Sequence, residues 1–472
     1  MPRTRPGVGA ILLMAGKGTR LKSDIAKIMH PLLGHPMGAW VLEACRNAGI
    51  GSRVLVIGHQ ADTVAAAFPD EITALQAEQK GTGHAVKIGL KKLSAEATMV
   101  LVINGDTPLL TPTTLANILA VHKKRRAACT LAVTVADDPT GLGRVEIDDR
   151  DNIEAMIEHQ DCTPEQQLNP LVNAGCYVFD RPLLEKYLKK LSTKNAQGEE
   201  YLTDVPTMLR KAGETVVAYI DGQSFGVMPN TRADLAHAAA LLQFRVVDEL
   251  YAAGVSIPQP DDVYIEPQVQ IAADAVIWGG TYLRGKTVIE AGAVIGPCAD
   301  ITDSVIRKGA TVRYSVVAQS EIGAGTTVGP YAHVREHARV GAKARIGNFV
   351  ELKKSTLADG VKAGHLTYLG DATIGANTNI GAGTITCNYD GVNKHPTTIG
   401  REVFIGSNAS LVAPVTIGDG AMTAAGSTIT KDVPPEALAF GRARQENHPP
   451  QVLKALQAKQ RALKSSKGAT KP

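Results

Sequence analysis

Aromatic residues are scarce in this 472-residue sequence: they make up 4% of it, as 7 Phe, 11 Tyr and 2 Trp. A large hydrophobic core must therefore be built mostly from Val, Ile, Leu and Ala. The hydrophobic share of 44% is still too high for a disordered chain. No run approaches the roughly 18 consecutive apolar residues of a membrane span. The apolar stretch at residues 8–15 is short and lacks a small-x-small cleavage site, so we interpret it as a strand rather than a signal peptide.

Strong charge and paired cysteines are also missing. The net charge is +4 and is spread along the chain, which argues against a nucleic-acid partner and suits small anionic substrates. The six cysteines form no CxxC motif, so we expect neither a zinc ribbon nor a disulfide framework, and we expect a reducing compartment, the cytoplasm. The length predicts roughly two to four domains.

A six-residue repeat dominates the second half of the chain. Aliphatic residues recur at every sixth position from Ile265 to Ile301, and again from Ile322 to Leu352 and, with one miss at Thr423, from Ile399 to Ile429. This period matches neither an amphipathic helix nor an alternating strand, but it is typical of a parallel β-helix, in which each coil turns its aliphatic residues inward. The period does not fix the hand; known hexapeptide prisms are left-handed, and we expect the same here.

The repeat is interrupted in three places. The step slips to five between Ile301 and Ile322, and between residues 358 and 370 the on-phase positions are Ala358, Gly364 and Gly370. Residues 386–398 break the period and should leave the prism as a loop. Insertions of this kind map to the binding face of repeat proteins.

The first 230 residues have a different pattern. Apolar, strand-like runs alternate with helix-like segments, which predicts an α/β domain with a mainly parallel sheet. The expected strands are residues 8–14, 54–57, 99–103 and 128–135, and the expected helices are 36–48, 113–122 and a long connecting helix at 232–253.

Polar, glycine-rich turns follow several of these strands. The first strand leads into Gly16-Lys17-Gly18-Thr19-Arg20, which matches neither a Walker A loop nor the dinucleotide GxGxxG motif. Further turns hold Lys27, Gln76 with Gly81, and Asn104-Gly105-Asp106. In an open α/β sheet ligands bind beyond the carboxyl ends of the strands, where all these turns can lie. Asp106 suits a Mg²⁺ ligand, although a lone aspartate is more often a turn or helix cap.

In the second half, His365 lies in the segment GHLTYLGD, where the repeat is loosened. A neutral histidine is the usual general base near pH 7, and Arg335, Lys353 and Lys394 suit a phosphate. The alternative is that these side chains are ordinary surface groups. A zinc site of His333, His337 and His365 is disfavoured, because a spacing of four does not bring side chains together on β-coils.

These motifs together resemble known enzymes. The first part, L-x-x-G-x-G-T-R followed by Lys27 and Gly105-Asp106, resembles the sugar-nucleotide pyrophosphorylases. With the long helix, the hexapeptide repeats, KAGHLTYLGD and GAGTITCNYDG following in order, nearly the whole chain resembles the bacterial bifunctional N-acetylglucosamine-1-phosphate uridyltransferase and glucosamine-1-phosphate N-acetyltransferase family.

The resemblance implies two activities in UDP-N-acetylglucosamine synthesis, which feeds peptidoglycan and lipopolysaccharide precursors. Acetyl-CoA would acetylate glucosamine-1-phosphate, and UTP with Mg²⁺ would then convert N-acetylglucosamine-1-phosphate to the nucleotide sugar with release of pyrophosphate. It implies small-molecule substrates and a homotrimer with acetyl-transfer sites between subunits, with neither nucleic acid nor membrane as a partner. The expected domains are an α/β nucleotidyltransferase domain with a Rossmann-like sheet at 1–231, a linker helix at 232–255, a left-handed β-helix acetyltransferase domain at 256–436, and a C-terminal arm with a basic tail at 437–472.

The resemblance also assigns site residues. In the first domain Arg20 and Lys27 would be catalytic and Asp106 and Asn230 would bind Mg²⁺. The nucleotide-sugar would be bound by Leu13, Met14, Ala15, Gly16, Lys27, Gln76, Gly81, Thr82, Asn104, Gly143, Glu158, Asn173 and Asn230. In the prism His365 would be the general base. Glucosamine phosphate would be bound by Arg335, Lys353, Tyr368, Asn379 and Lys394, and acetyl-CoA by Ala382, Asn388, Tyr389, Ser407, Ala425 and Arg442.

Five features depart from the family pattern, and all of them fall in the first domain. Met14 replaces an Ala, Ala26 a Pro, and Asn104 and Leu142 each a Tyr, while Met228-Pro229 is an insertion before Asn230. Uridyl transfer is therefore the activity that these departures affect.

Three alternatives remain at this point. One is a pyrophosphorylase with a regulatory prism, one a non-enzymatic scaffold of the same architecture, and one a β-helix carbonic anhydrase with zinc. The intact GHLTYLGD and GAGTITCNYDG segments argue against the first, and Arg20, Lys27 and Asp106 against the second.

Overall fold

The computed structural model describes residues 5, 7–136, 138–195, 197–220 and 227–468. It divides into two compact units, which we describe separately. The N-terminal unit comprises Met1–Glu249 and Tyr264–Pro267, and the C-terminal unit comprises Leu250–Val263 and Gln268–Pro472. Among the described residues, no helix has both the length and the apolar character needed to span a membrane.

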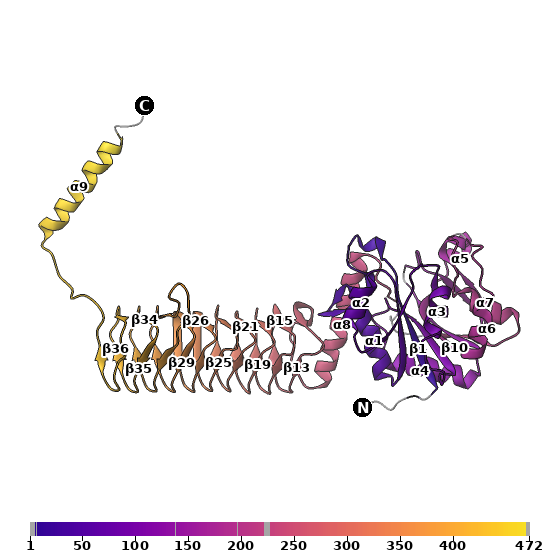
Figure 1. Cartoon of the computed structure of the whole chain (residues 1–472), viewed down its shortest axis with the longest axis horizontal. Helices are drawn as coiled ribbons and strands as arrows, with labels where there is room; N and C mark the ends of the chain where they lie inside the picture. Colours follow the sequence, from indigo (N-terminus) through magenta and orange to yellow (C-terminus); the bar gives the residue numbers. More distant parts are fainter. Residues whose placement is uncertain (1–4, 6, 137, 196, 221–226, 469–472) are drawn as a thin grey trace. The chain divides into compact units, whose positions relative to one another are not determined.

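The N-terminal unit is built on a mixed sheet (Figure 1). Its strands run in the order β11-β7-β10-β6-β1-β4-β5, and β8 and β9 extend it beside β10. β1 is parallel to β4 and β6, as predicted, but β10 is antiparallel to both β6 and β7. The strands are β1 (Val8–Met14), β4 (Ser52–Ile57), β5 (Ile72–Leu75), β6 (Met99–Asn104), β7 (Cys129–Val135), β8 (Arg144–Ile147), β9 (Ile153–Ile157), β10 (Leu171–Asp180) and β11 (Val216–Ile220), with a separate hairpin of β2 (Pro31–Leu32) and β3 (His35–Pro36).

Helices cover both faces of this sheet. Side chains alternate along β1: Ala10, Leu12 and Met14 pack in one core with α1, α4 and α8, whereas Ile11 packs in a second core with α3, α6 and α7. The helices are α1 (Met37–Asn47), α2 (Ala61–Ala67), α3 (Thr82–Leu90), α4 (Pro112–Arg125), α5 (Pro164–Gln167), α6 (Arg181–Leu188), α7 (Asp204–Lys211) and α8 (Arg232–Ala252). Short 3-10 turns are η1 (Thr19–Leu21), η2 (Lys27–Met29), η3 (His159–Asp161) and, in the C-terminal unit, η4 (Pro260–Asp262).

The C-terminal unit is a left-handed parallel β-helix, and the sequence repeat maps onto its coils (Figure 1). Inward aliphatic residues pair in register one coil apart, as in Ile277 with Ile295 and Ile301 with Val317. Where the step slips to five, Ile306, Val312 and Val317 are still fully buried, so the coil corners absorb the missing residue.

Each coil passes over three faces. The first face holds β14 (Val276–Ile277), β17 (Val294–Ile295), β20 (Thr311–Val312), β23 (Thr327–Val328), β30 (Asn379–Ile380), β33 (Phe404–Ile405), β36 (Met422–Thr423) and β38 (Leu438–Ala439). The second face holds β12 (Val263–Ile265), β15 (Thr281–Arg284), β18 (Asp300–Thr302), β21 (Val316–Ala318), β24 (His333–Arg335), β31 (Ile385–Cys387), β34 (Ser410–Val412) and β37 (Thr428–Ile429). The third face holds β13 (Gln270–Ile271), β16 (Val288–Ile289), β19 (Val305–Ile306), β22 (Glu321–Ile322), β25 (Arg339–Val340), β27 (Thr356–Leu357), β29 (Ala372–Ile374), β32 (Thr397–Ile399) and β35 (Val415–Ile417).

Two long strands, β26 (Arg345–Lys353) and β28 (Lys362–Gly370), continue across the corner between the first and second faces. They lie where the sequence repeat is loosened. The predicted loop leaves the prism between β31 and β32, at residues 388–396, and α9 (Pro450–Gly468) follows the last coil along the chain.

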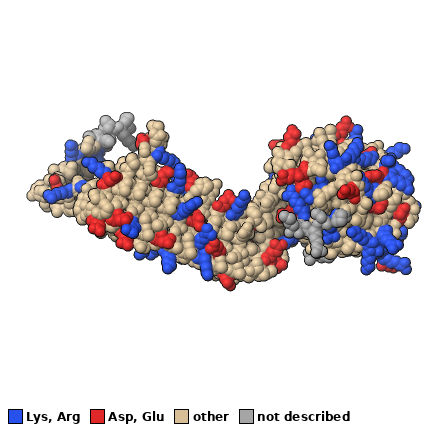
Figure 2. Space-filling view, turned by 60° about the horizontal axis from the view of Figure 1, so that its bottom comes forward, with Lys and Arg blue, Asp and Glu red and all other residues tan. Residues whose placement is uncertain are grey.

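Charges are balanced along the prism. Figure 2 shows acidic and basic side chains interspersed over the prism face in view. Some of them link neighbouring coils: the Arg307 guanidinium lies 2.7 Å from both the Glu290 and the Glu321 carboxylates. Because these pairs are exposed, each contributes little to stability.

Candidate functional sites

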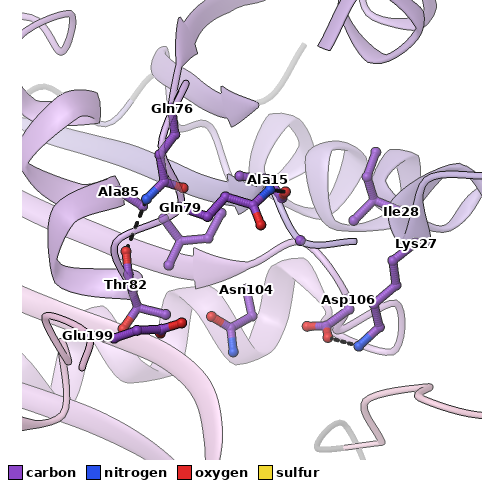
Figure 3. A pocket seen from close by; sticks show the side chains of 13 residues that line it. Ala15, Lys27, Ile28, Gln76, Gln79, Thr82, Ala85, Asn104, Asp106 and Glu199 are labelled. Carbon is purple, nitrogen blue, oxygen red and sulfur yellow. Dashed lines mark hydrogen bonds and ion pairs between the residues drawn. The ribbon is translucent and has the colours of Figure 1, made fainter. Parts of the chain in front are cut away.

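A cavity of about 300 Å³ opens at the carboxyl ends of β1 and β6 (Figure 3). It brings together nine of the residues assigned above from distant parts of the sequence. They are Leu13, Ala15, Gly16, Lys27, Gln76, Gly81, Thr82, Asn104 and Asp106.

The turn between Gln76 and α3 forms one wall of this cavity. The Gln76 side chain is only 3% exposed, and its Nε2 donates to the Gly81 carbonyl at 3.1 Å. Gly81 has φ +103°, and a Cβ there would lie 2.6 Å from the Glu200 carbonyl oxygen. Only glycine therefore fits at this point, where the turn meets the segment before α7.

Four polar side chains form a cluster, of which Lys27 and Asp106 line this cavity and Arg20 and Asn230 line the adjoining one. The Lys27 ammonium contacts the Asp106 carboxylate (Figure 3) and lies 2.7 Å from Asn230 Oδ1, to which Arg20 also donates at 2.8 Å. Gly18 makes this approach feasible, because a Cβ at Gly18 would lie 2.7 Å from the Cβ of Lys27. Asn230 thus reaches the site despite the insertion before it.

A second cavity adjoins this cluster and contains three more of the residues predicted to bind the nucleotide-sugar, Gly143, Glu158 and Asn173. Burial raises the pKa of the Glu158 carboxyl, whose Oε1 accepts from the Thr203 hydroxyl at 3.1 Å. Asn173 Nδ2 donates to the Tyr177 hydroxyl at 2.6 Å, and its Oδ1 accepts from the Gly175 N–H at 2.9 Å. Both polar side chains are therefore held by neighbours before any ligand binds.

The departures from the family pattern have separate structural settings. Met14 is 1% exposed and lies in the core beneath the cavity rather than among its lining residues. Asn104 and Met228 lie together, with Asn104 Nδ2 4.0 Å from the Met228 sulfur, and both line the second cavity with Leu142. The Ala26 N–H, which a proline would lack, donates to Gln60 Oε1 at 2.9 Å.

Several cavity residues were not foreseen. Gln79 Nε2 donates to the Ala15 carbonyl at 2.6 Å and so ties the glycine-rich turn to the Gln76 turn. Its place between Gln76 and Gly81 in the sequence was an available signal. Glu199 and Thr203 also line the two cavities, but nothing in the pattern around them marked them as site residues.

In the prism, His365 lies at the corner between the first and second faces. Its Nδ1 is 2.6 Å from Oδ1 of Asn348, the residue opposite it in β26. Ala382, Ser407 and Ala425 occupy the equivalent corner position on the next coils, each just before a residue with positive φ, namely Gly383, Asn408 and Gly426. The predicted base and three predicted acetyl-CoA residues thus form one column, which we call the corner column.

The predicted phosphate-binding cations gather at the other end of the second face. Arg335 Nε donates to Glu351 at 2.9 Å, and Lys353 lies 3.6 Å from the Glu336 carboxylate. Contact with the Lys353 ammonium lowers the pKa of Lys394, which places these two cations together.

Tyr368 lies between the base and the cations. Lys353 is opposite Gly370 in register, and Gly370 is five residues beyond His365 on β28, at most about 16 Å away. Asn379, by contrast, lies in β30 on the first face, opposite Lys362, and so apart from the cations of its own chain.

The other predicted acetyl-CoA residues lie beside the corner column or on the loop. Asn388 is buried and donates to the Asp371 carboxylate at 2.6 Å, whereas Tyr389 is exposed on the loop and donates to the Gly391 carbonyl at 2.6 Å. Arg442 has its Cδ 3.8 Å from the place of a Cβ on Gly426. Across the described part of the chain, no three His, Cys, Asp or Glu side chains are grouped as a metal site, and His333, His337 and His365 are no exception.

An α/β site at the strand ends and a hexapeptide-repeat prism with a histidine corner define a two-site transferase. The nucleotidyl transferase family model matches residues 9–226, and the bacterial transferase hexapeptide model (six repeats) matches residues 319–354 and 396–431.

Relatives match along nearly the whole chain. The "Bifunctional protein GlmU" of an Exiguobacterium species is 46% identical over 93% of this chain and 98% of its own length, and that of Trichlorobacter lovleyi is 45% identical over 93% and 96%. The solved structure of HddC from Yersinia pseudotuberculosis covers 50% of this chain and 99% of its own at 20% identity, with a TM-score of 0.39, and adds nothing to the assignment.

The chain belongs to the family of bifunctional GlmU proteins. It is a bifunctional enzyme of UDP-N-acetylglucosamine synthesis, with a nucleotidyltransferase and an acetyltransferase activity. The relatives match both units at 44–46% identity and carry the name of a bifunctional protein, which argues against a purely regulatory prism and against a non-enzymatic scaffold.

Proposed function

We propose that the N-terminal unit transfers uridylyl from UTP to N-acetylglucosamine-1-phosphate at the cluster of Arg20, Lys27, Asp106 and Asn230. The sugar phosphate oxygen attacks the α-phosphorus, and pyrophosphate leaves. This chemistry depends on positioning and charge neutralisation more than on covalent catalysis. Lys27 and Arg20 would bind the triphosphate, while Gln76 and the turn at Gly81 would recognise the uracil base by hydrogen bonds. The convergence of these four side chains at the strand ends is the observation that carries this half of the proposal.

Mg²⁺ fits the same cluster. The Asp106 carboxylate and the Asn230 amide oxygen already converge on one positive charge, the Lys27 ammonium. Oxygen donors of this kind are those that Mg²⁺ prefers. When bound there it would neutralise the charge of the triphosphate. Glu158 and Asn173 would hold the sugar in the adjoining cavity, on the far side of the cluster.

In the prism we propose that His365 is the general base. The amine of glucosamine-1-phosphate attacks the thioester carbonyl of acetyl-CoA while His365 takes the amine proton; the carbon–sulfur bond then breaks, and the proton passes to the departing thiolate. Arg335, Lys353 and Lys394 would hold the phosphate, and Tyr368 would lie along the sugar. Acetyl-CoA would follow the corner column past Ala382, Ser407 and Ala425 towards Arg442, with Asn388 and Tyr389 at its side.

We propose further that the enzyme is a cytoplasmic homotrimer, with domains at 1–231, 256–436 and 437–472 and the linker helix at 232–255. Asn379 lies on a different face from the cations, so the prism of a neighbouring copy would complete the sugar site. Tyr314, Tyr331 and Phe349 form an exposed aromatic ladder with ring centroids 5.9 and 5.5 Å apart, which suits burial between copies. All six cysteines are free thiols, in keeping with a reducing compartment.

The test is one reaction of the full-length protein with Mg²⁺, acetyl-CoA, glucosamine-1-phosphate and UTP, in which CoA thiol and pyrophosphate are followed together. We expect both products. His365→Ala should lower thiol release by at least about 100-fold. Asp106→Ala should abolish pyrophosphate release while thiol release continues. An unchanged rate in either variant would refute the role of that residue.

A further inference from the structure

Asn348 lies on the coil before His365, at the same corner position, and so extends the corner column by one coil. The two side chains are opposite each other in register, and each precedes a corner residue in the left-handed region, Phe349 with φ +59° and Leu366 with φ +49°. Non-glycine residues adopt this conformation at an energetic cost, so the corner is a specified feature of the fold. The Thr367 hydroxyl also donates to the His365 carbonyl at 2.7 Å and fixes the backbone beside it.

The contact between these side chains determines which ring nitrogen of His365 holds the proton. Asn348 Oδ1 lies 2.6 Å from His365 Nδ1. An amide oxygen only accepts hydrogen bonds, so Nδ1 must be the donor, and Nε2 of the neutral ring keeps its lone pair. A general base needs that lone pair directed at the substrate.

We propose that Asn348 is a positioning residue for acetyl transfer, which holds the His365 ring in the tautomer and orientation in which Nε2 accepts the amine proton. This inference rests on the proposed role of His365 as the base. It adds a residue to the reaction that touches the base rather than the substrate.

The uncharged nature of this acceptor is part of its role. Asn348 and His365 line a groove with Arg313 and Arg345, and the described residues that line it include no carboxylate. A carboxylate at position 348 would favour the protonated imidazolium, which cannot act as a base, whereas an amide orients the ring and leaves it neutral. The other charged or titratable side chains of β26 and β28 are Lys362, on the strand of His365, and Tyr368, Glu351 and Lys353 on the second face, where Glu351 pairs with Arg335.

The first measurement is steady-state kinetics of Asn348→Ala in the full-length enzyme. We expect kcat for acetyl transfer to fall by roughly 10- to 100-fold, as for other groups that orient a histidine, with the KM values for acetyl-CoA and glucosamine-1-phosphate nearly unchanged. Uridyl transfer by the same preparation is the internal control for folding and should keep its full rate. A variant with the wild-type kcat would overturn the proposal.

The second measurement is the pH profile of Asn348→Asp, which keeps the acceptor but adds a charge. Because the carboxylate favours the imidazolium, the acid limb of kcat should move to higher pH by about one unit, with activity recovering on the alkaline side. The shift requires that the side chain at position 348 faces the ring of the base, so an unshifted limb would also overturn the proposal.

A double-variant comparison separates this inference from the proposed function. If Asn348 acts through His365, then His365→Ala combined with Asn348→Ala should be no slower than His365→Ala alone. A further loss in the double variant would show that Asn348 acts independently. If His365→Ala alone keeps its activity, His365 is not the base, and the proposed function of the prism fails together with this inference. If His365→Ala is inactive but Asn348→Ala is not, only this inference fails.

Discussion

The two units build their sites in different ways. The N-terminal site collects single residues from separate turns, such as Lys27 at the start of η2, Gln76 after β5, Asp106 after β6 and Asn230 before α8. The prism instead places Asn348, His365, Ala382, Ser407 and Ala425 at one repeated corner position. In this α/β domain each functional side chain therefore comes from a different loop. In a repeat fold the same corner position recurs on every coil, so a substitution at one of these positions is enough to add a functional side chain to the site.

Their interiors differ as well. The buried polar residues of the N-terminal unit include His30, His122 and Arg144. In the described part of the prism the buried polar residues are Ser, Thr, Asn388 and, directly after β12, Glu266. Several of the hydroxyls bond to a carbonyl two residues back, as Ser304 does to Thr302. The prism interior therefore lacks groups that titrate near neutral pH among the residues described, and we expect the two units to respond differently to metal, mixing, truncation and acid.

The largest difference should follow from chelation of divalent metal. With EDTA in excess, pyrophosphate release should fall by at least about 1,000-fold, because Asp106 and Asn230 would lose their cation. Thiol release should continue, since side chains supply the charges of the prism site. Equal loss of both products would mean that the prism also needs a metal.

Mixing of inactive chains tests where each site is completed. When Lys353→Ala and Asn379→Ala chains are co-expressed, about a quarter of the acetyl-transfer sites of random mixed trimers should combine two intact residues. Thiol release should recover to about that fraction of wild type. Lys27→Ala with Asp106→Ala should recover no pyrophosphate release, because those residues belong to one chain. Pyrophosphate release by the second pair, or no thiol release by the first pair, would contradict the proposal that only the prism site is shared between chains.

Truncation of one buried leucine in each unit tests their independence. Leu352→Ala in the prism and Leu12→Ala in β1 each remove a fully buried side chain and should each cost about 2–5 kcal/mol. Calorimetry of the full-length protein should show that each variant lowers the transition of its own unit. A single transition that moves equally in both variants would mean that the units unfold together.

Acid should weaken the N-terminal unit through His122. Burial lowers the pKa of His122 to about 4, whereas in the unfolded chain it is about 6.5. Between these values the unfolded chain binds the extra proton, so stability is complete above about pH 6.5 and is lost as the pH falls towards 4, by on the order of 2–3 kcal/mol. In His122→Gln this part of the pH dependence of the N-terminal transition should vanish. The prism transition should be the same in both proteins.

The smallest effect should come from Ala26→Pro, which restores the family residue. It removes the hydrogen bond to Gln60, worth about 1 kcal/mol, but φ of Ala26 is −54°, which proline accepts, and the unfolded chain loses entropy. We expect a net change within about 1 kcal/mol by thermal denaturation, with uridyl transfer unchanged. A loss of several kcal/mol would show that Gln60 has a larger role.

Periodicity predicted the elements that repeat or alternate. The six-residue period indicated the prism, its loop and its slipped steps, and apolar runs indicated β1, β4, β6 and β7 within two residues. The antiparallel β10 in the middle of the sheet could not be read from its sequence, because strand direction depends on how the chain returns. Asn348 was missed for a related reason: it contacts His365, 17 residues along the chain, and only the folded register brings the two together. Gln79 lies between two assigned residues, Gln76 and Gly81, but its contact with Ala15 also depends on the fold.

The corner column also makes the prism a molecular ruler. His365 and Ala425 are three coils apart, about 14 Å at the spacing of parallel strands. Duplication or loss of one coil between them would lengthen or shorten the proposed acetyl-CoA site by one fixed increment and leave the proposed base at its end unchanged. Evolution can thus tune the reach of such an enzyme in whole-coil steps, a freedom that the loop-built site of the N-terminal unit does not have.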